Sequence, residues 1–164
     1  MIKIPKLLQS LVALSRFKVG THLREEIDQQ NLEVRNKCRW CLRYIQECCD
    51  EQVQSELVNN RYGRVLSITF STAGGKGEEQ DEEIENGLEC IKYFLIGLHT
   101  GRTYRQPSFQ PLPLLVRRSE EQIEEEGANE EIEAQLNDNG YDGDIKYYAN
   151  DAKAVTLNHF IHGG

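Results

Sequence analysis

The sequence predicts a small α+β domain in which a long N-terminal helical hairpin packs with a small antiparallel sheet and a second helix. Three observations lead to this prediction. Apolar residues recur at helical spacing through the first third of the chain, a β-branched stretch near the middle alternates in hydropathy, and two further stretches near the C-terminus resemble strands. In 164 residues we expect a compact α+β domain over 1–118, an acidic helix or linker over 119–143, and C-terminal strands over 144–164.

The first predicted helix follows Pro5, a residue that suits the first turn of a helix. Its apolar positions repeat at helical spacing up to Leu14, and Gly20 ends the apolar stretch. The pattern fits a short core helix, or an amphipathic helix that contacts a membrane or a partner protein.

The most regular pattern of the chain runs from residue 31 to residue 57. Its apolar positions up to Cys48 alternate between spacings of four and three, and two later positions continue roughly the same face. The seam on one helix is Val34, Cys38, Cys41, Ile45, Cys48, Val53 and Leu57. This spacing is typical of a helix that packs lengthwise on a partner, so we expect the seam to lie in the core. Residues 21–57 then form one long helix, or two with a break near residues 29–31, after Thr21 as N-cap.

Strands and a second helix are expected in the rest of the chain. Residues 65–72 alternate and are rich in β-branched side chains, which predicts a strand. A helix should follow over about 81–98, with Gly101 as its stop and a buried face made of Ile84, Leu88, Ile91, Leu95 and Leu98. Three prolines then favour extended backbone with an edge strand at 114–117, and two final strands are predicted at 145–149 and 154–161. No internal repeat is visible.

Charge is distributed unevenly along the chain. The net charge is −8, but residues 1–64 carry +3 and residues 65–164 carry −11. This total argues against a protein that coats nucleic acid with its whole surface. Eight glutamates between residues 119 and 137 accompany only Ile123, Ile132 and Leu136 as apolar residues, which predicts a solvated helix or a disordered linker.

The five cysteines do not form the spaced framework of a secreted disulfide scaffold. Four of them lie on the predicted central helix, and the total is odd. We therefore expect an intracellular, reducing compartment, the cytoplasm or the nucleus. No stretch approaches the roughly 20 apolar residues that a transmembrane helix needs, and no signal peptide is expected.

A basic and aromatic cluster on the central helix is the first candidate site. Its residues combine cations that bind phosphate or carboxylate groups with flat rings on which bases can stack: Arg35, Lys37, Arg39, Trp40, Arg43 and Tyr44. The cluster predicts a surface for RNA, for single-stranded nucleic acid or for an acidic protein. The alternative is a solvated helix face whose aromatic rings pack against a second helix.

A zinc site is the second candidate. Cys38 and Cys41 are three residues apart, as are His159 and His162, and two such pairs supply a tetrahedral Cys₂His₂ set. The competing interpretation is that the cysteines fill the core as small apolar side chains. No other cofactor is expected.

Two weaker signals concern catalysis. Residues 73–77 resemble a phosphate-binding loop, but Phe70 and Gly77 stand where that motif requires glycine and serine or threonine, so a turn is expected. Cys90 with a histidine could form a thiolate pair, although no flanking motif supports it. The terminal Gly163–Gly164 is a frayed end or a processing site.

These patterns favour a non-enzymatic regulatory or accessory protein that acts through contacts with partner proteins, which the sequence does not identify. A homodimer along the cysteine seam is one form of such contact. Small viral accessory proteins that counter host defence fit the same description. The alternative is an RNA- or single-strand-binding module that uses the basic and aromatic cluster, and a zinc-binding protein comes third.

Overall fold

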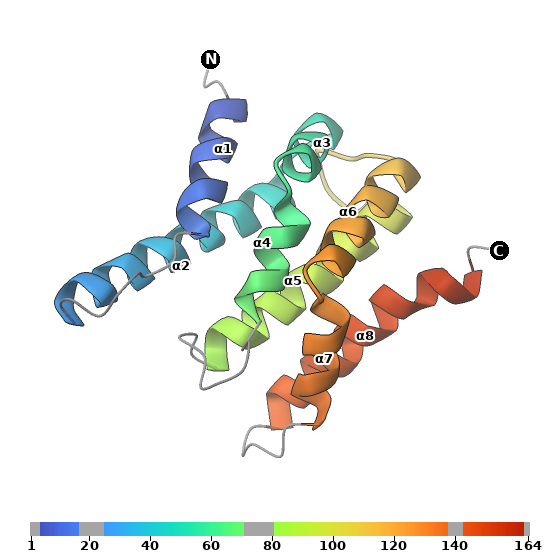
Figure 1. Cartoon of the computed structure of the whole chain (residues 1–164). Coiled ribbons are helices and arrows are strands. Elements are labelled where there is room, and N and C mark those ends of the chain that lie inside the picture. The colour runs from blue at the N-terminus through green and yellow to red at the C-terminus, as the bar shows by residue number, and fades with distance from the viewer. Residues whose placement is uncertain (1–3, 17–24, 71–80, 138–142, 163–164) are drawn as a thin grey trace.

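The computed structural model describes residues 4–16, 25–70, 81–137 and 143–162. These residues form eight helices, and their only β-type contact is a single bridge between Arg102 and Phe109 (Figure 1). The fold is therefore all-α, and the α+β prediction with its antiparallel sheet is wrong.

The helices occupy most of the described chain. Their bounds are α1 Ile4–Ser15, α2 Glu25–Cys48, α3 Glu51–Asn59, α4 Tyr62–Thr69, α5 Asp81–Thr100, α6 Pro113–Glu125, α7 Ala128–Asn137 and α8 Gly143–His162. None of these helices has the length and apolar character needed to cross a bilayer.

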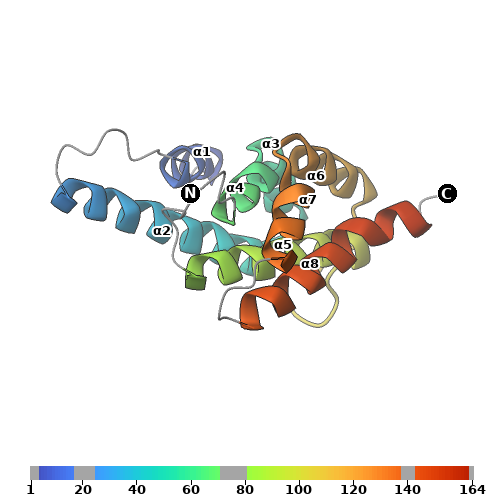
Figure 2. The same ribbon diagram turned by 60° about the horizontal axis from the view of Figure 1, so that its bottom comes forward.

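Two layers of helices enclose one core. Figure 2 shows the long helices α2, α5 and α8 side by side in one layer, with α1, α3, α4, α6 and α7 above them. The most extensive packing joins α5 to α8, α1 to α2 and α7 to α8. Buried side chains from Leu8 in α1 to Ala152 in α8 belong to a single apolar cluster between the layers.

A three-helix unit occurs twice in succession after α2. In α3–α4–α5 and again in α6–α7–α8, two shorter helices precede a 20-residue helix. Both units turn between their shorter helices at a residue with left-handed backbone, Arg61 (φ 61°) and Gly127 (φ 69°). Buried side chains recur at matching offsets from these corners: Leu57, Tyr62 and Leu66 in the first unit, and Ile123, Ala128 and Ile132 in the second. Leucine matches isoleucine at two of these positions, but Tyr62 matches Ala128, a far smaller residue.

The prediction of a strand at 65–72 was wrong for residues 65–70, the part of that range that the structure describes. A short helix that is buried on nearly every side occupies most of it. In α4, Val65, Ser67 and Thr69 are all buried, and so are Leu66 and Phe70 between and after them. A strand and a short helix that is buried on every side can have the same short apolar sequence, so the pattern does not distinguish them. In this protein the helix forms.

The other three predicted strands also lie in helices. Pro113 occupies the first turn of α6, so the proline that suggested extended backbone starts a helix instead. Residues 145–149 and 154–161 both fall within α8. There Ile145, Ala149 and Ala152 follow helical spacing, and small alanines make that apolar face hard to recognise.

The second predicted helix was correct. The expected face of α5, from Ile84 to Leu98, is buried at all five positions. Gly101 follows the helix with φ 74°, and its amide donates to the Gly97 carbonyl oxygen at 2.9 Å. A side chain at Gly101 would also meet the Phe109 carbonyl oxygen at 2.5 Å, so glycine is required at this stop.

The break in the central helix falls later than expected, between α2 and α3. Asp50 caps α3, because its Oδ1 accepts a hydrogen bond from the Val53 amide at 3.1 Å. The predicted break near residues 29–31 was wrong, and Thr21 lies outside the described residues.

The predicted seam is rotated by about one residue from the buried face of α2. Val34 is 47% exposed and Cys41 is exposed, whereas Cys38 is buried and Ile45 half-buried. The side chains that α2 does bury include Arg35, Arg39, Leu42 and Gln46. Because the buried face of α2 carries polar and charged residues, the cysteine seam is the more regular apolar pattern in the sequence.

The acidic segment packs onto the body of the molecule. α6 and α7 bury Val116, Ile123, Ala128 and Ile132 in the common core. Gln135 reaches the Phe70 carbonyl oxygen with its side-chain amide at 3.4 Å. Residues 119–137 thus lie in α6 and α7 apart from a turn at 126–127, and several of their glutamates, such as Glu121 and Glu124, are exposed.

Candidate functional site

The basic and aromatic cluster of α2 separates into a buried part and an exposed part. Arg35 and Arg39 are 5% and 7% exposed and therefore contribute to the inner face of the helix. Lys37 is exposed, and Trp40 and Tyr44 are 45% and 69% exposed. The six predicted residues therefore do not form one continuous cationic surface.

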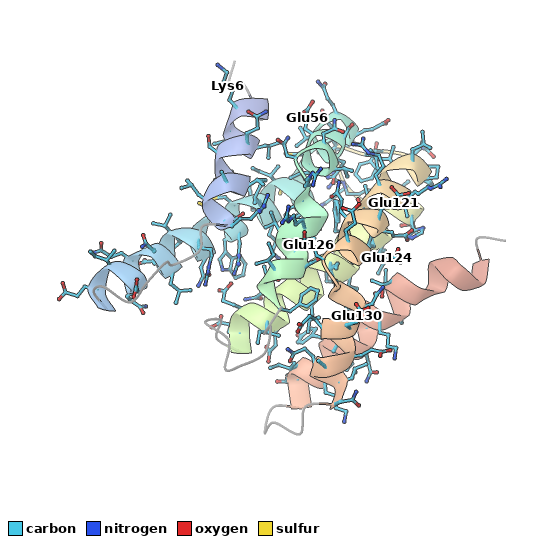
Figure 3. The ribbon with its side chains drawn as sticks, in the orientation of Figure 1. Lys6, Glu56, Glu121, Glu124, Glu126 and Glu130 are labelled. Carbon is cyan, nitrogen blue, oxygen red and sulfur yellow. The ribbon has the colours of Figure 1, made fainter. Side chains whose placement is uncertain are left out.

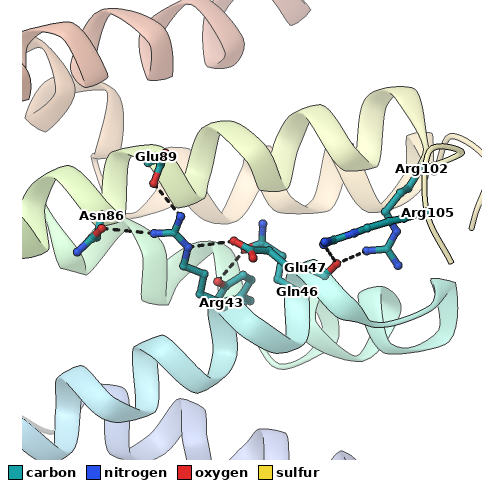
Figure 4. Close-up of polar contacts among 8 residues, drawn as sticks. Arg43, Gln46, Glu47, Asn86, Glu89, Arg102 and Arg105 are labelled. Atoms are coloured by element: carbon teal, nitrogen blue, oxygen red, sulfur yellow. Dashed lines mark hydrogen bonds and ion pairs between the residues drawn. The ribbon is translucent and has the colours of Figure 1, made fainter. Parts of the chain in front are cut away.

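Arg43, the remaining residue of the cluster, bridges α2 and α5. Its Nε donates to Glu47 Oε1 at 3.0 Å, its Nη2 donates to Glu89 Oε2 at 2.7 Å, and its Nη1 reaches Asn86 Oδ1 at 3.4 Å (Figure 4). The guanidinium carbon also lies 5.2 Å from the centre of the Trp40 ring. Arg43 is thus held by two carboxylates, an amide and an aromatic face.

Two pockets lie along α5, and Arg43 lines both. We call this region, with its two pockets, the α2–α5 groove. The smaller pocket has a volume of about 30 Å³ and reaches the first half of α5 at Asn86, Gly87 and Cys90. Trp40 also lines this pocket. The larger pocket has a volume of about 290 Å³ and follows the second half of α5.

Buried Tyr62 and Cys90 line the smaller pocket. The Tyr62 hydroxyl donates to Gln46 Oε1 at 2.8 Å, and its ring packs edge-on against Phe94 with centroids 5.1 Å apart. Burial raises the pKa of the Cys90 thiol to about 12. The thiol is therefore protonated near neutral pH, which disfavours the thiolate chemistry considered for this residue.

The larger pocket is lined by aromatic residues at two depths. Phe94 and Phe109 are buried, whereas Tyr93 is 49% exposed and Tyr104 is 80% exposed. Gly97 leaves the wall of α5 open, because a Cβ built there would meet no atom within 4 Å. The pocket therefore combines an apolar floor with accessible aromatic edges.

Arg102 and Arg105 line the same pocket and bind the C-terminus of α2. Arg102 donates to the carbonyl oxygens of Glu47 (2.5 Å), Pro107 (2.7 and 2.9 Å) and Cys49. Arg105 donates to the Glu47 carbonyl as well (Figure 4). α2 has no basic residue in its own last turn, so these two arginines satisfy carbonyl groups that the helix leaves free.

Sequence reasoning did not find Arg102, Arg105, Tyr93 or Gly97. A Gly–Arg pair directly after a helix stop is a weak signal for a cation near a helix end. Nothing in the local sequence indicates that Arg102 reaches back across 55 residues to the carbonyl of Glu47.

The zinc candidates separate as well. Cys38 is buried and Cys41, one turn further along α2, is exposed. The predicted strand at His159 and His162 is helical, but their side chains lie outside the described part of the chain. Within the described residues no group of three or more candidate ligands is close enough to hold a metal ion. The glycine-rich residues 73–77 and Gly163–Gly164 are also outside the described ranges.

Comparison with known proteins adds no family to this description. The sequence matches no protein-family model, and no curated protein resembles it closely enough to count as a relative.

Proposed function

We propose that this chain is a non-enzymatic accessory protein that binds a segment of a partner protein in the α2–α5 groove. The observation that supports this proposal most directly is the 290 Å³ pocket between two long helices, with Tyr93 and Tyr104 accessible at its edge. Exposed tyrosine and tryptophan side chains around a cavity are typical of surfaces that bury a partner's side chain.

The repeated architecture supports the same proposal. Stacked helical units place their long helices side by side, and such stacks present extended surfaces to bound chains. In this protein α2, α5 and α8 form that layer (Figure 2). A partner segment lying in the groove would contact Trp40 on α2 and Tyr93 on α5, which are both about half exposed.

The nucleic-acid alternative has weaker support. Of its four cations, Arg35 and Arg39 are buried, and Arg43 already pairs with Glu47 and Glu89. Lys37, Trp40 and Tyr44 are the members that stay exposed. If RNA were the ligand, affinity should fall steeply with salt and Lys37→Ala should reduce that slope by roughly one phosphate contact.

Site-specific photo-crosslinking in cells tests the proposal. A benzophenone amino acid replaces Tyr93 in the groove, and in a matched control it replaces Tyr147 on α8, which is 61% exposed and lines neither groove pocket. We expect a discrete protein adduct from position 93 that survives nuclease and that is absent at position 147. Equal adducts from both positions, or adducts that nuclease removes, would contradict the proposal.

The same experiment separates the forms that the partner can take. An adduct of twice the chain's mass identifies a second copy and hence a homodimer. An adduct with a host factor, in cells infected by a virus that encodes the chain, supports the viral accessory role. The proposed compartment is a reducing one, where the thiol of Cys41 stays free.

A further inference from the structure

We infer that the 290 Å³ pocket anchors the bound segment by taking an aromatic side chain with an anionic group beside it. The anion is the carboxylate of an aspartate or glutamate next to that aromatic residue in the bound segment. This inference rests on the proposed function, because it names the chemistry that the α2–α5 groove would recognise.

The shape of the pocket supports an aromatic side chain. Its volume lies near the lower end of the range for ligand pockets, which is enough for one large side chain but not for a folded element. Phe94 and Phe109 form an apolar floor, and Tyr93 and Tyr104 can contact the edge or face of an inserted ring. The open space at Gly97 leaves room along the wall of α5.

The charge of the lining supports an anion. Three arginines line the pocket, Arg43, Arg102 and Arg105, together with one carboxylate, Glu47. Glu47 pairs with Arg43, whereas the hydrogen bonds described for Arg102 and Arg105 all go to carbonyl oxygens. Carbonyl groups orient a guanidinium without cancelling its charge. The pocket is therefore locally positive in a chain of net charge −8.

Arg105 is the residue placed to contact the anion. Arg102 is 5% exposed and uses its donors on the Glu47, Cys49 and Pro107 carbonyl oxygens. Arg105 is exposed, is held at its Nη2 by the Glu47 carbonyl oxygen, and lies with its guanidinium carbon 5.9 Å from the centre of the Tyr104 ring. A guanidinium supported in this way can offer its remaining donors to a carboxylate or phosphate as a planar fork.

A displayed library of random 12-residue peptides, selected on the full chain, tests the inference. We expect enriched peptides to carry an aromatic residue next to aspartate or glutamate. Binding of a selected peptide, measured by fluorescence polarisation, should weaken at least tenfold on Gly97→Phe, which fills the pocket from α5. Gly97→Ala is the matched control and should bind within twofold of the wild type, because its Cβ meets nothing within 4 Å.

The anion is tested with Arg105→Glu and with two forms of the selected peptide. Arg105→Glu should weaken binding at least tenfold, and selection on this variant should enrich lysine or arginine where the wild type enriched acidic residues. A peptide with tyrosine at the anchor and the acidic residue replaced by alanine is then measured with and without phosphate on the tyrosine. Loss of binding in both forms supports the neighbouring carboxylate as the anion, whereas recovery on phosphorylation would overturn that assignment in favour of a phosphate.

Failure of this inference can be told from failure of the proposed function. If the wild type selects no peptide, or selects peptides that bind Gly97→Phe and Arg105→Glu as well as the wild type, the inference is overturned. The proposed function still stands in that case if position 93, but not 147, crosslinks to a partner. Circular dichroism and thermal unfolding of each variant confirm that lost binding is not lost folding.

Discussion

The two helical layers use charged residues in opposite ways. On the layer of shorter helices, Glu121, Glu124 and Glu130 are exposed on the outer side of α6 and α7 (Figure 3). Glu126 is the exception among the labelled glutamates of this segment, because it pairs with Arg64 of α4 at 2.5 Å. In the layer of long helices, Arg43 binds two carboxylates and an amide between α2 and α5, and Arg102 binds three carbonyl groups while it is 5% exposed.

This difference shows that the sign and number of charges do not reveal their role. A solvated glutamate adds solubility and contributes little to the free energy of unfolding, because exposed ion pairs are worth about 0–1 kcal/mol. A buried arginine that donates to several carbonyl groups is costly to remove, because carbonyl groups that lose their only donor inside the protein are left unpaired. The following predictions separate the two cases.

Arg102 should give the largest effect. We expect Arg102→Met to destabilise the protein by about 3 kcal/mol, because the carbonyls of Glu47, Cys49 and Pro107 lose a charged donor. Urea unfolding followed by circular dichroism measures this change. Arg105→Ala is the matched control and should change the free energy of unfolding by less than about 0.5 kcal/mol, since Arg105 is exposed. If the two variants lowered the free energy of unfolding equally, the burial of Arg102 would not explain its contribution to stability.

Two glycines of α5 should respond in opposite directions. A Cβ at Gly87 would lie 1.9 Å from Thr69 Oγ1, where α4 crosses α5, whereas a Cβ at Gly97 meets nothing within 4 Å. We expect Gly87→Ala to cost about 1–3 kcal/mol through overpacking. Gly97→Ala should stabilise the helix by about 0.5–1 kcal/mol.

Thermal unfolding compares these variants, and Thr69→Ala tests the cause. In the Gly87→Ala background, Thr69→Ala removes the nearest clashing atom and should restore part of the lost stability. If it restores none, the contact between α4 and α5 does not limit the size of residue 87.

The sequence predicts the helices that expose one polar face and fails for those that do not. α5 follows the standard pattern from Ile84 to Leu98, so its buried face could be read directly. α4 is buried on nearly all sides, so the polar residues Ser67 and Thr69 lie in the core beside Val65 and Leu66, and its eight residues read as an alternating strand. α8 packs through alanines such as Ala149 and Ala152, which carry little apolar signal.

The candidate site was partly predictable for a related reason. Trp40, Arg43 and Tyr44 could be recognised as accessible or interacting residues from their types and spacing on α2. Arg35 and Arg39 could not be recognised as buried, because local sequence does not reveal what covers a helix face. The larger pocket requires α2, α5 and residues 101–110 to meet, and that contact is set by tertiary packing alone.

The cysteines should report the true orientation of α2 through their labelling rates. Cys41 is exposed and should react with a maleimide at least tenfold faster than Cys38, which is 7% exposed and whose pKa is raised by burial and by Cys41. Mass spectrometry of the native protein after short pulses at pH 7 measures both rates. Equal labelling rates would mean that Cys38 and Cys41 are both buried or both exposed, which would contradict the orientation of α2.

Cys90 extends this test to alkaline pH. Burial raises the pKa of the Cys90 thiol from 9.0 to about 12. Cys90 should therefore stay unlabelled at pH 9 during a pulse that labels the exposed Cys41. The unfolded chain ionises Cys90 at lower pH than the folded chain does. Stability should therefore be unaffected by this thiol below pH 9 and fall as the pH rises from about 9 towards 12. Cys90→Ala should lessen that alkaline loss.

The smallest effect is expected on the outer layer, at the C-terminal end of α6. Glu124 and Glu125 are exposed and lie in the last turn of that helix, where the helix dipole disfavours negative charge and no basic residue offsets it. Changing both to glutamine should therefore stabilise the protein, by at most about 0.5 kcal/mol, and leave peptide binding in the groove within twofold of the wild type. Glu89→Gln is the matched control in the other layer, and it should destabilise by about 1–2 kcal/mol because it weakens the 2.7 Å contact with Arg43. Urea titrations of the three proteins at the same ionic strength make the comparison. A loss of more than 1 kcal/mol from the double variant would show that the acidic surface holds the fold together, and the contrast between the layers would then be wrong.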